Sequence, residues 1–116
     1  MPAFIVSCNV VLSKEAATAF CNEACTVLAK MLGKPESFMC VSYDNPLALN
    51  WERSDEPAAV CRLVSLGTSS PDLNRQVSAK VSELLDKHCK VAPNRYYLEF
   101  VDPPRTELGW SGRTFA

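Results

Sequence analysis

The amino-acid sequence predicts an α/β (α+β) fold: tandem β-α-β repeats that form a four-stranded mixed sheet with two helices on one face. The first observation behind this prediction is an internal repeat. Pro35-Glu36-Ser37-Phe38 precedes one apolar run, and Pro93-Asn94-Arg95-Tyr96 precedes another about half a chain length later. The same offset aligns Ile5-Val6-Ser7 with Leu63-Val64-Ser65. Each half of the chain therefore reads as strand, helix, strand.

The second observation is a pair of amphipathic helix patterns, each with its own start signal. The first helix is predicted to follow Ser13 as N-cap and to end before Gly33, which suits a left-handed C-terminal position. The second is predicted to follow Ser70, with Pro71 at its first position, and to end near His88-Cys89. Apolar residues recur at helical spacing between these limits.

The third observation is that the predicted strands are apolar on both faces. In the last strand, for example, Tyr96 and Leu98 alternate with Tyr97 and Val101. Two helices can cover only one face of a sheet, so the other face needs a partner. We therefore expect an oligomer that forms through the second sheet face. The predicted strands span residues 3–8, 38–43, 58–66 and 95–101.

Two further segments connect or follow these elements. Residues 45–55 form a turn-rich connection that carries Leu47, Leu49 and Trp51. Residues 105–116 form a tail rich in apolar and aromatic side chains, which are costly to leave in water. We expect this tail to dock, on a neighbouring subunit or over a pocket.

Composition narrows the class of protein. The 116 residues are expected to form one domain, 1–116, and the formal net charge of -1 gives no basic patch for nucleic acid or a membrane surface. The six cysteines mostly lie in apolar periodic segments, so we expect reduced thiols rather than a disulfide framework. We see no signal-peptide pattern and expect a cytoplasmic protein.

Pro2 is a candidate catalytic residue. Removal of Met1 would give Pro2 a free secondary amine, and an α-amino group already titrates below a lysine. Apolar surroundings and a nearby cation would lower its pKa further, which suits a general base at neutral pH. The alternative is that Pro2 merely follows Met1 without a chemical role.

Several short motifs, taken together and in order, resemble the macrophage migration inhibitory factor and D-dopachrome tautomerase family. The resemblance runs over the whole chain. The motifs that carry it are Pro2-Ala3-Phe4-Ile5-Val6, Leu32-Gly33-Lys34-Pro35, Ser54-Asp55-Glu56-Pro57, Ser65-Leu66-Gly67, Asn94-Arg95-Tyr96-Tyr97 and Gly109-Trp110-Ser111-Gly112-Arg113-Thr114-Phe115.

The resemblance implies a homotrimer with active sites between subunits and a keto–enol tautomerase activity on phenylpyruvate-type (aryl-pyruvate) substrates. It implies that Pro2 is the catalytic acid/base and that no cofactor or metal is needed. Lys34 and the backbone amide of Leu66 match the groups that hold the substrate carboxylate, and Tyr97 matches a pocket tyrosine given by the adjacent subunit. The residues that match the apolar and aromatic walls are Phe38, Leu108, Trp110 and Phe115.

The sequence departs from the family pattern at three places. Glu52 and Arg53 stand where many members have Gly-Gly, which puts the conformation of that loop in question. Ala58 and Cys61 replace a Cys-x-x-Cys, so we expect no redox activity of that kind. Glu99 replaces an asparagine of the pocket, and its negative charge could disfavour anionic or phenolic substrates.

Alternatives remain open beside the enzymatic reading. The family also includes cytokine-like proteins that bind a cell-surface receptor and leave cells without a leader, and an interaction scaffold with a vestigial pocket is a third hypothesis. Lys34 could simply complement a helix dipole. Arg62 could contact a substrate carboxylate or form an ion pair between subunits. We expect His88 at a solvent-facing helix end, and no metal site at Cys21 and Cys25.

Overall fold

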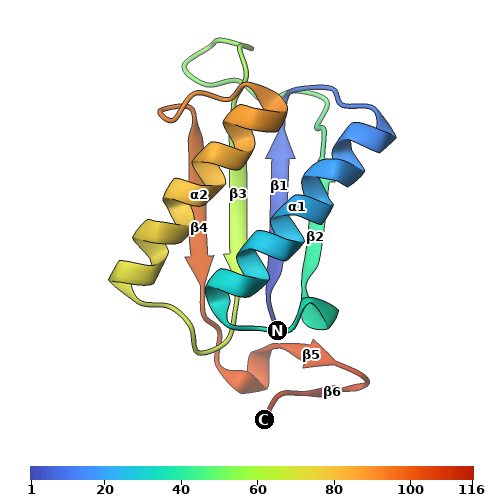
Figure 1. Cartoon of the computed structure of the whole chain (residues 1–116), viewed down its shortest axis with the longest axis vertical. Helices are drawn as coiled ribbons and strands as arrows, with labels where there is room; N and C mark the ends of the chain where they lie inside the picture. The colour runs from blue at the N-terminus through green and yellow to red at the C-terminus, as the bar shows by residue number, and fades with distance from the viewer.

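The computed structural model describes residues 1–116, and it shows one sheet with two antiparallel helices packed on one of its faces (Figure 1). The first repeat consists of β1 (Ala3–Cys8), α1 (Lys14–Leu32) and β2 (Cys40–Asp44). The second consists of β3 (Ala59–Val64), α2 (Pro71–Cys89) and β4 (Tyr96–Val101). The predicted four-stranded mixed sheet with both helices on one face is confirmed.

The sheet has the strand order β2-β1-β3-β4. Each repeat contributes a parallel pair, β1 with β2 and β3 with β4, and the central β1 and β3 pair antiparallel. Parallel strands require a crossover connection, which each helix supplies. The register places Ala3 opposite Val64, and Val64 opposite Val101, at one end of the sheet.

Local capping groups begin and end the helices as the sequence predicts. The Ser13 hydroxyl accepts a hydrogen bond from the Ala16 N–H at 3.1 Å, and the Ser70 hydroxyl accepts one from the Leu73 N–H at 3.2 Å. Gly33 ends α1 with a φ of 67°, in the left-handed region that glycine tolerates best. Lys90 ends α2 with a φ of 59° without that advantage.

No helix in the structure has both the length and the apolar composition that crossing a membrane requires.

The second strand begins later than predicted. Phe38 was expected in a strand spanning 38–43, but it lies in the short 3-10 helix η1 (Glu36–Phe38). There the Met39 N–H donates to the Glu36 carbonyl oxygen at 2.9 Å, which closes a helical turn. Because β2 therefore starts at Cys40, the Phe38 side chain is free of the sheet and 41% exposed.

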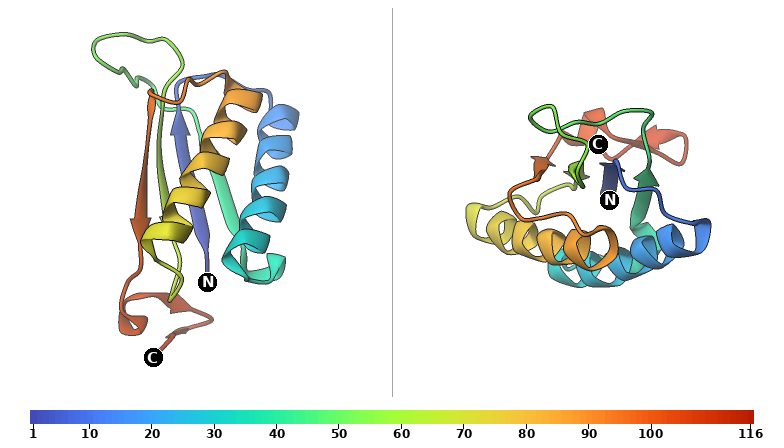
Figure 2. Two further views of the ribbon diagram at one scale, coloured as in Figure 1. Left: turned by 60° about the vertical axis from the view of Figure 1, so that its left-hand side comes forward. Right: turned by 90° about the horizontal axis from the view of Figure 1, so that it is seen from above.

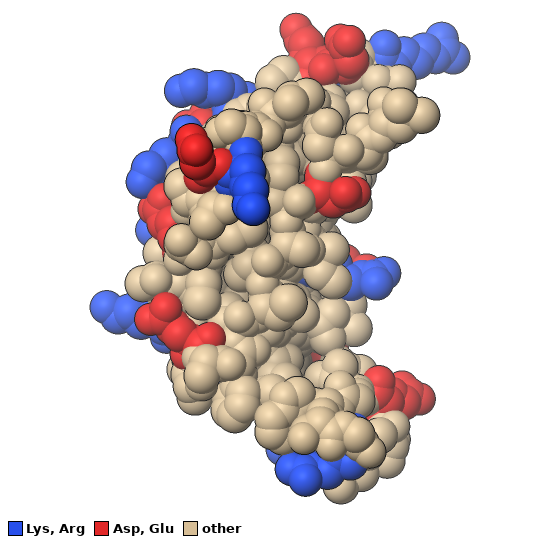
Figure 3. All heavy atoms as spheres, turned by 90° about the vertical axis from the view of Figure 1, so that its right-hand side faces the viewer, with Lys and Arg blue, Asp and Glu red and all other residues tan.

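The core fills the space between the sheet and the helices, and the opposite sheet face is uncovered. Fully buried Phe4, Phe20 and Leu85 belong to this core. On the other face, Ile5 and Tyr97 are 44% and 68% exposed. Figure 2 shows both helices on one side of the sheet, and Figure 3 shows the uncovered side in profile as a hollow between two projecting lobes. This uncovered side, called the open face below, is where we expect a partner.

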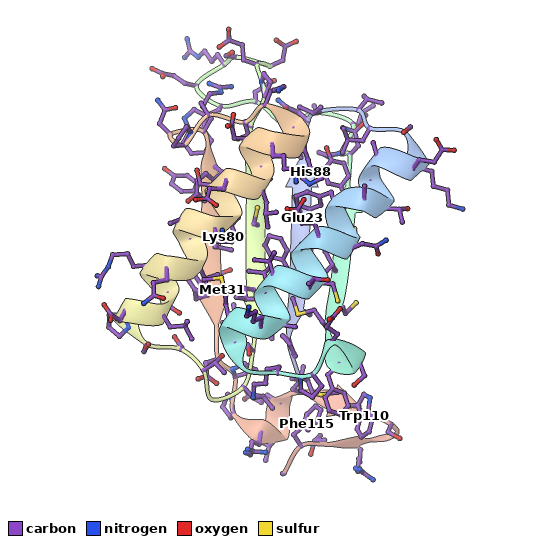
Figure 4. All side chains as sticks on the ribbon, viewed as in Figure 1. Glu23, Met31, Lys80, His88, Trp110 and Phe115 are labelled. Atoms are coloured by element: carbon purple, nitrogen blue, oxygen red, sulfur yellow. The ribbon has the colours of Figure 1, made fainter.

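His88 does not face solvent, contrary to the sequence-based expectation. Its Nε2 atom lies 2.7 Å from the Glu23 Oε1 atom on α1, and its ring packs edge-on against Phe20 with centroids 5.4 Å apart. Figure 4 shows Glu23 and His88 pointing toward each other between the two helices. The last turn of α2 thus faces α1, so His88 joins the helices.

The cysteines are all free thiols in the structure. Cys8, Cys61 and Cys89 are buried among apolar residues, and desolvation raises the pKa of the Cys61 thiol to about 12. They serve as small hydrophobic groups, as the sequence predicts. No three His, Cys, Asp or Glu side chains lie close enough together to hold a metal ion.

Candidate active site

The amino terminus lies at the end of the sheet where β1 begins. Pro2 is fully buried, and its carbonyl oxygen accepts a hydrogen bond from the Cys40 N–H at 3.1 Å. Burial lowers the pKa of the Met1 amino group, and the nearby cations Lys34 and Arg105 lower it further. This end of the chain therefore favours a neutral amine.

Lys34 reaches this region because of the way α1 ends. Gly33 turns the chain in the left-handed conformation, and the Lys34 N–H then donates to the Ala29 carbonyl oxygen at 2.9 Å. The Lys34 ammonium donates to the Leu66 carbonyl oxygen at 3.2 Å. This contact fixes the cation beside the turn that follows β3.

Leu66 lies in that turn, which is tied to the end of β4. The Ser65 N–H donates to the Val101 carbonyl oxygen at 2.9 Å, and the Gly67 N–H donates to Asp102 Oδ1 at 3.0 Å. The Leu66 side chain is 6% exposed, whereas its N–H donates to no group of the chain. The Lys34 cation thus lies beside a residue whose backbone N–H is unpaired, and neither group has an anionic partner, which suits a carboxylate.

Three aromatic rings form a group beneath the amino terminus. Trp110 packs edge-on against Phe38 with ring centroids 6.0 Å apart, and it stacks on Phe115 at 5.9 Å. Trp110 belongs to a small hairpin of β5 (Gly109–Trp110) and β6 (Arg113–Thr114), which follows the 3-10 helix η2 (Arg105–Glu107). Figure 1 shows this hairpin beside the amino terminus, and Figure 4 shows Trp110 in it and Phe115 next to it.

The tail folds back on itself through backbone contacts, and the packing of Trp110 on Phe38 joins it to the rest of its own chain. The Phe115 N–H donates to the carbonyl oxygens of Arg105 and Leu108, at 3.1 and 3.2 Å. This fold-back also brings Arg105 near the amino terminus. Arg105 has no distinctive sequence motif, and sequence reasoning missed it.

All but one of the residues predicted for the site lie together at the end of the sheet where β1 begins. The exception is Tyr97, which lies level with Ser7 and Val60 toward the opposite end of the sheet. Ala3 and Ser7 are four strand residues apart, or about 13 Å. The gathered residues are Pro2, Lys34, Phe38, Leu66, Leu108, Trp110 and Phe115.

The open face carries a charged pair near Tyr97. Arg62 pairs with Glu99 within the same chain, with its Nε atom 3.1 Å from the Glu99 Oε1 atom, and its contact with a substrate or a neighbouring subunit stays a prediction. Trp51 also packs on Tyr97, with ring centroids 4.6 Å apart. The sequence placed Trp51 in a turn-rich connection but contained no sign of this contact.

The fold and the buried amino-terminal end together define a class: proteins of two β-α-β repeats with a proline-headed first strand. The family model for macrophage migration inhibitory factor matches residues 1–116. A macrophage migration inhibitory factor homolog of Brugia malayi is 36% identical over 115 residues, which cover 99% of each chain. This chain belongs to the macrophage migration inhibitory factor family.

Solved structures agree with this assignment. Macrophage migration inhibitory factor of Toxoplasma gondii superposes with a TM-score of 0.90 at 28% identity, covering 97% of this chain and 99% of that one. A homologue from Prochlorococcus marinus superposes with a TM-score of 0.92 at 24% identity, covering 98% and 99%. The latter likeness concerns the fold alone.

Proposed function

We propose that this protein is a keto–enol tautomerase of phenylpyruvate-type substrates, with Pro2 as its general base once Met1 is removed. The family includes known tautomerases. The observation that carries the proposal is the setting of the amino terminus: Pro2 is buried, and burial, Lys34 and Arg105 lower the pKa of the Met1 amino group that directly precedes it. A neutral amine at this position can accept a proton near neutral pH.

The proposed reaction moves one proton and leaves the redox state unchanged. The Pro2 amine takes a proton from the carbon next to the keto group, and the electrons of that C–H bond form the carbon–carbon double bond of the enol. The keto oxygen gains a proton, which the protonated Pro2 can return. A base that recovers its neutral form in this way needs no cofactor.

Lys34 and Leu66 would hold the substrate carboxylate. The Lys34 ammonium supplies the charge, and the unpaired Leu66 N–H supplies a directed donor. Phe38, Trp110 and Phe115 would line the space for the aromatic ring and exclude water from it. Held at both ends, the substrate would present its reacting carbon to Pro2, and such positioning supplies much of an enzyme's rate.

A homotrimer would complete the site. Proteins of this family typically form trimers. Two features support this state here: the open face exposes Ile5 and Val60 at 44% and 50%, and Tyr97 lies far along the sheet from Pro2. A neighbouring copy that covers the open face could bring its own Tyr97 to the Pro2 end of this chain.

Three measurements test the proposal. Intact mass should show the loss of Met1, and light scattering should give a trimer. Phenylpyruvate tautomerisation should be measurable in the parent protein and fall by about 10²- to 10⁴-fold in Pro2→Gly, which keeps a free amino terminus but not the secondary amine. Equal rates in the two proteins would refute the assignment of Pro2 as the base.

A cytokine-like role is the second candidate, favoured by the family to which the chain belongs. In that role the protein would bind a cell-surface receptor, and the pocket would be weakly active or vestigial. A trimer that retains Met1 and shows no turnover would favour this candidate. A scaffold would likewise form a trimer without turnover, but it would not bind to cells.

A further inference from the structure

Trp51 is the only aromatic neighbour of Tyr97. Their ring centroids lie 4.6 Å apart with the planes tilted by 39°. Within one chain Tyr97 is 68% exposed on the open face, and Trp51 is the one ring of its own subunit that packs against it. Before any neighbouring subunit is added, the direction of the Tyr97 ring is therefore set within its own chain by the Trp51 ring.

Trp51 is itself held by a tight turn that starts at its own backbone. The Trp51 N–H donates to the Ser54 carbonyl oxygen at 2.9 Å, and the Ser54 N–H donates to the Trp51 carbonyl oxygen at 3.0 Å. The two central residues, Glu52 and Arg53, have φ angles of 50° and 63°. Positive φ at both central positions defines a type I′ turn, which non-glycine residues adopt only when the surroundings hold it.

Asn9 and Arg95 supply that support from the body of the fold. The Asn9 side-chain amide donates to the carbonyl oxygens of Leu49 and Glu56, at 3.0 and 2.9 Å, one before and one after the turn. The Arg95 guanidinium also donates to the Glu56 carbonyl oxygen, at 2.9 Å. Figures 1 and 2 show the connection between β2 and β3 projecting beyond the end of the sheet toward the open-face side.

We infer that Trp51 is a positioning residue for substrate binding: it holds the Tyr97 ring in the orientation that serves the active site of the neighbouring subunit. This inference rests on the proposed function. A fixed ring loses less rotational freedom when substrate binds, so the effect falls on binding rather than on the chemical step. Trp51 does not touch the reacting atoms.

Kinetics with a double-mutant cycle test this role. Trp51→Ala should raise the KM for phenylpyruvate about three- to tenfold with kcat within about twofold, and Trp51→Phe should restore most of the loss. In a Tyr97→Ala background, Trp51→Ala should have no further effect. An equal effect in both backgrounds would show that Trp51 acts through loop packing rather than through Tyr97, and would overturn the inference.

A second measurement does not depend on turnover. The Tyr97 ring protons, observed by NMR with labelled tyrosine, should shift in Trp51→Ala because they lose the ring current of the indole. Arg53→Ala, a change in the same turn, should leave those resonances in place. Unmoved Tyr97 resonances in Trp51→Ala would refute the contact whatever the activity of the protein.

Binding of trans-cinnamate distinguishes failure of the proposed tautomerase function from failure of the proposed role of Trp51. Cinnamate has the carboxylate and the aromatic ring but no keto group to tautomerise. If the parent protein binds cinnamate without turning over phenylpyruvate, the proposed function fails, and the same cycle is then measured as the Kd for cinnamate. If the parent protein turns over phenylpyruvate but the cycle shows no coupling, only the role of Trp51 fails. A parent protein that neither binds cinnamate nor turns over phenylpyruvate overturns both proposals.

Discussion

Arg62 and Glu99 face each other across strands β3 and β4, with the Arg62 Nε atom 3.1 Å from the Glu99 Oε1 atom. Both side chains are more than half exposed, so the pair by itself adds little to the stability of one chain. Its importance is electrostatic. From the sequence, the charge of Glu99 was expected to disfavour anionic or phenolic substrates, but the structure places a guanidinium beside it that offsets this charge.

Removing one partner of this pair should change substrate affinity in a direction set by the charge that remains. In the proposed trimer, Arg62→Gln leaves Glu99 uncompensated and should raise the KM for the phenylpyruvate anion about two- to fivefold, whereas Glu99→Gln should lower it. The double variant should resemble the parent. Steady-state kinetics at low and high salt check this, because added salt should shrink both effects. Shifts of KM in the same direction for both single variants would contradict it.

The pH profile should report the amino group directly. Catalysis requires the neutral amine, so kcat/KM should rise as the pH increases through the pKa of the Pro2 amine. Burial, Lys34 and Arg105 lower the pKa of the Met1 amino group, and the Pro2 amine would occupy the same surroundings, so this rise should come below the usual range for an α-amino group.

Arg105 offers a matched pair of variants for that profile. Arg105→Gln removes a cation, so the protonated amine becomes less unfavourable and the rise should move to higher pH. Arg105→Lys keeps the charge and should leave the rise nearly in place. Measuring kcat/KM across the pH range for both variants checks the assignment. If the rise in kcat/KM comes at the same pH in Arg105→Gln as in the parent protein, the amine is not the titrating base.

Local sequence signals predicted the helices and strands, whereas the arrangement of the candidate site depends on contacts between residues far apart in the sequence. Ser13, Gly33 and Ser70 act on neighbouring residues, so their roles could be predicted from short spacings. The Lys34–Leu66 contact joins the ends of two different elements, and periodicity says nothing about it. Only the resemblance to a family indicated that these two residues belong together.

One departure from expectation and one question that the sequence left open have the same cause. His88 looked like an exposed helix end, because the sequence does not state the angle at which α2 crosses α1. The conformation of the loop at Glu52 and Arg53 was in question, because both residues lack the freedom of glycine. The turn forms nevertheless, since Asn9 holds the chain on both sides of it. In both places tertiary packing outweighs a local preference.

Glu23 should stabilise the fold in a pH-dependent way. Hydrogen bonds from Lys87 and His88 lower the pKa of the Glu23 carboxyl group, so the folded state binds its proton less tightly than the unfolded state does. The stabilisation is therefore complete above the pKa of an unfolded glutamate, about 4.3. It is lost as the pH falls through the lowered pKa of the folded state.

Glu23→Gln should thus lower the free energy of unfolding at neutral pH by about 0.5 to 1 kcal/mol, with little effect in acid. Glu83→Gln is the matched control, because Glu83 pairs with Lys80 on the same helix at an exposed position. Glu83→Gln should lower the free energy of unfolding by less, since the Glu83–Lys80 pair joins no second helix. Denaturant unfolding at neutral and acidic pH measures both variants, and a Glu23 effect that grows in acid would contradict the lowered pKa of this carboxyl group.

Replacing Arg53 with glycine should stabilise the turn that follows Trp51. Arg53 has a φ of 63°, and an L-residue in the left-handed region costs roughly 1 to 2 kcal/mol. Glycine removes that cost but gives the unfolded chain more freedom, so Arg53→Gly should raise the free energy of unfolding by about 0.5 to 1 kcal/mol. Arg53→Ala removes the same exposed side chain yet keeps the Cβ atom, and it should bring no gain. Thermal and denaturant unfolding compare the two variants, and an equal gain from alanine would place the benefit in the loss of the arginine side chain instead of in the backbone.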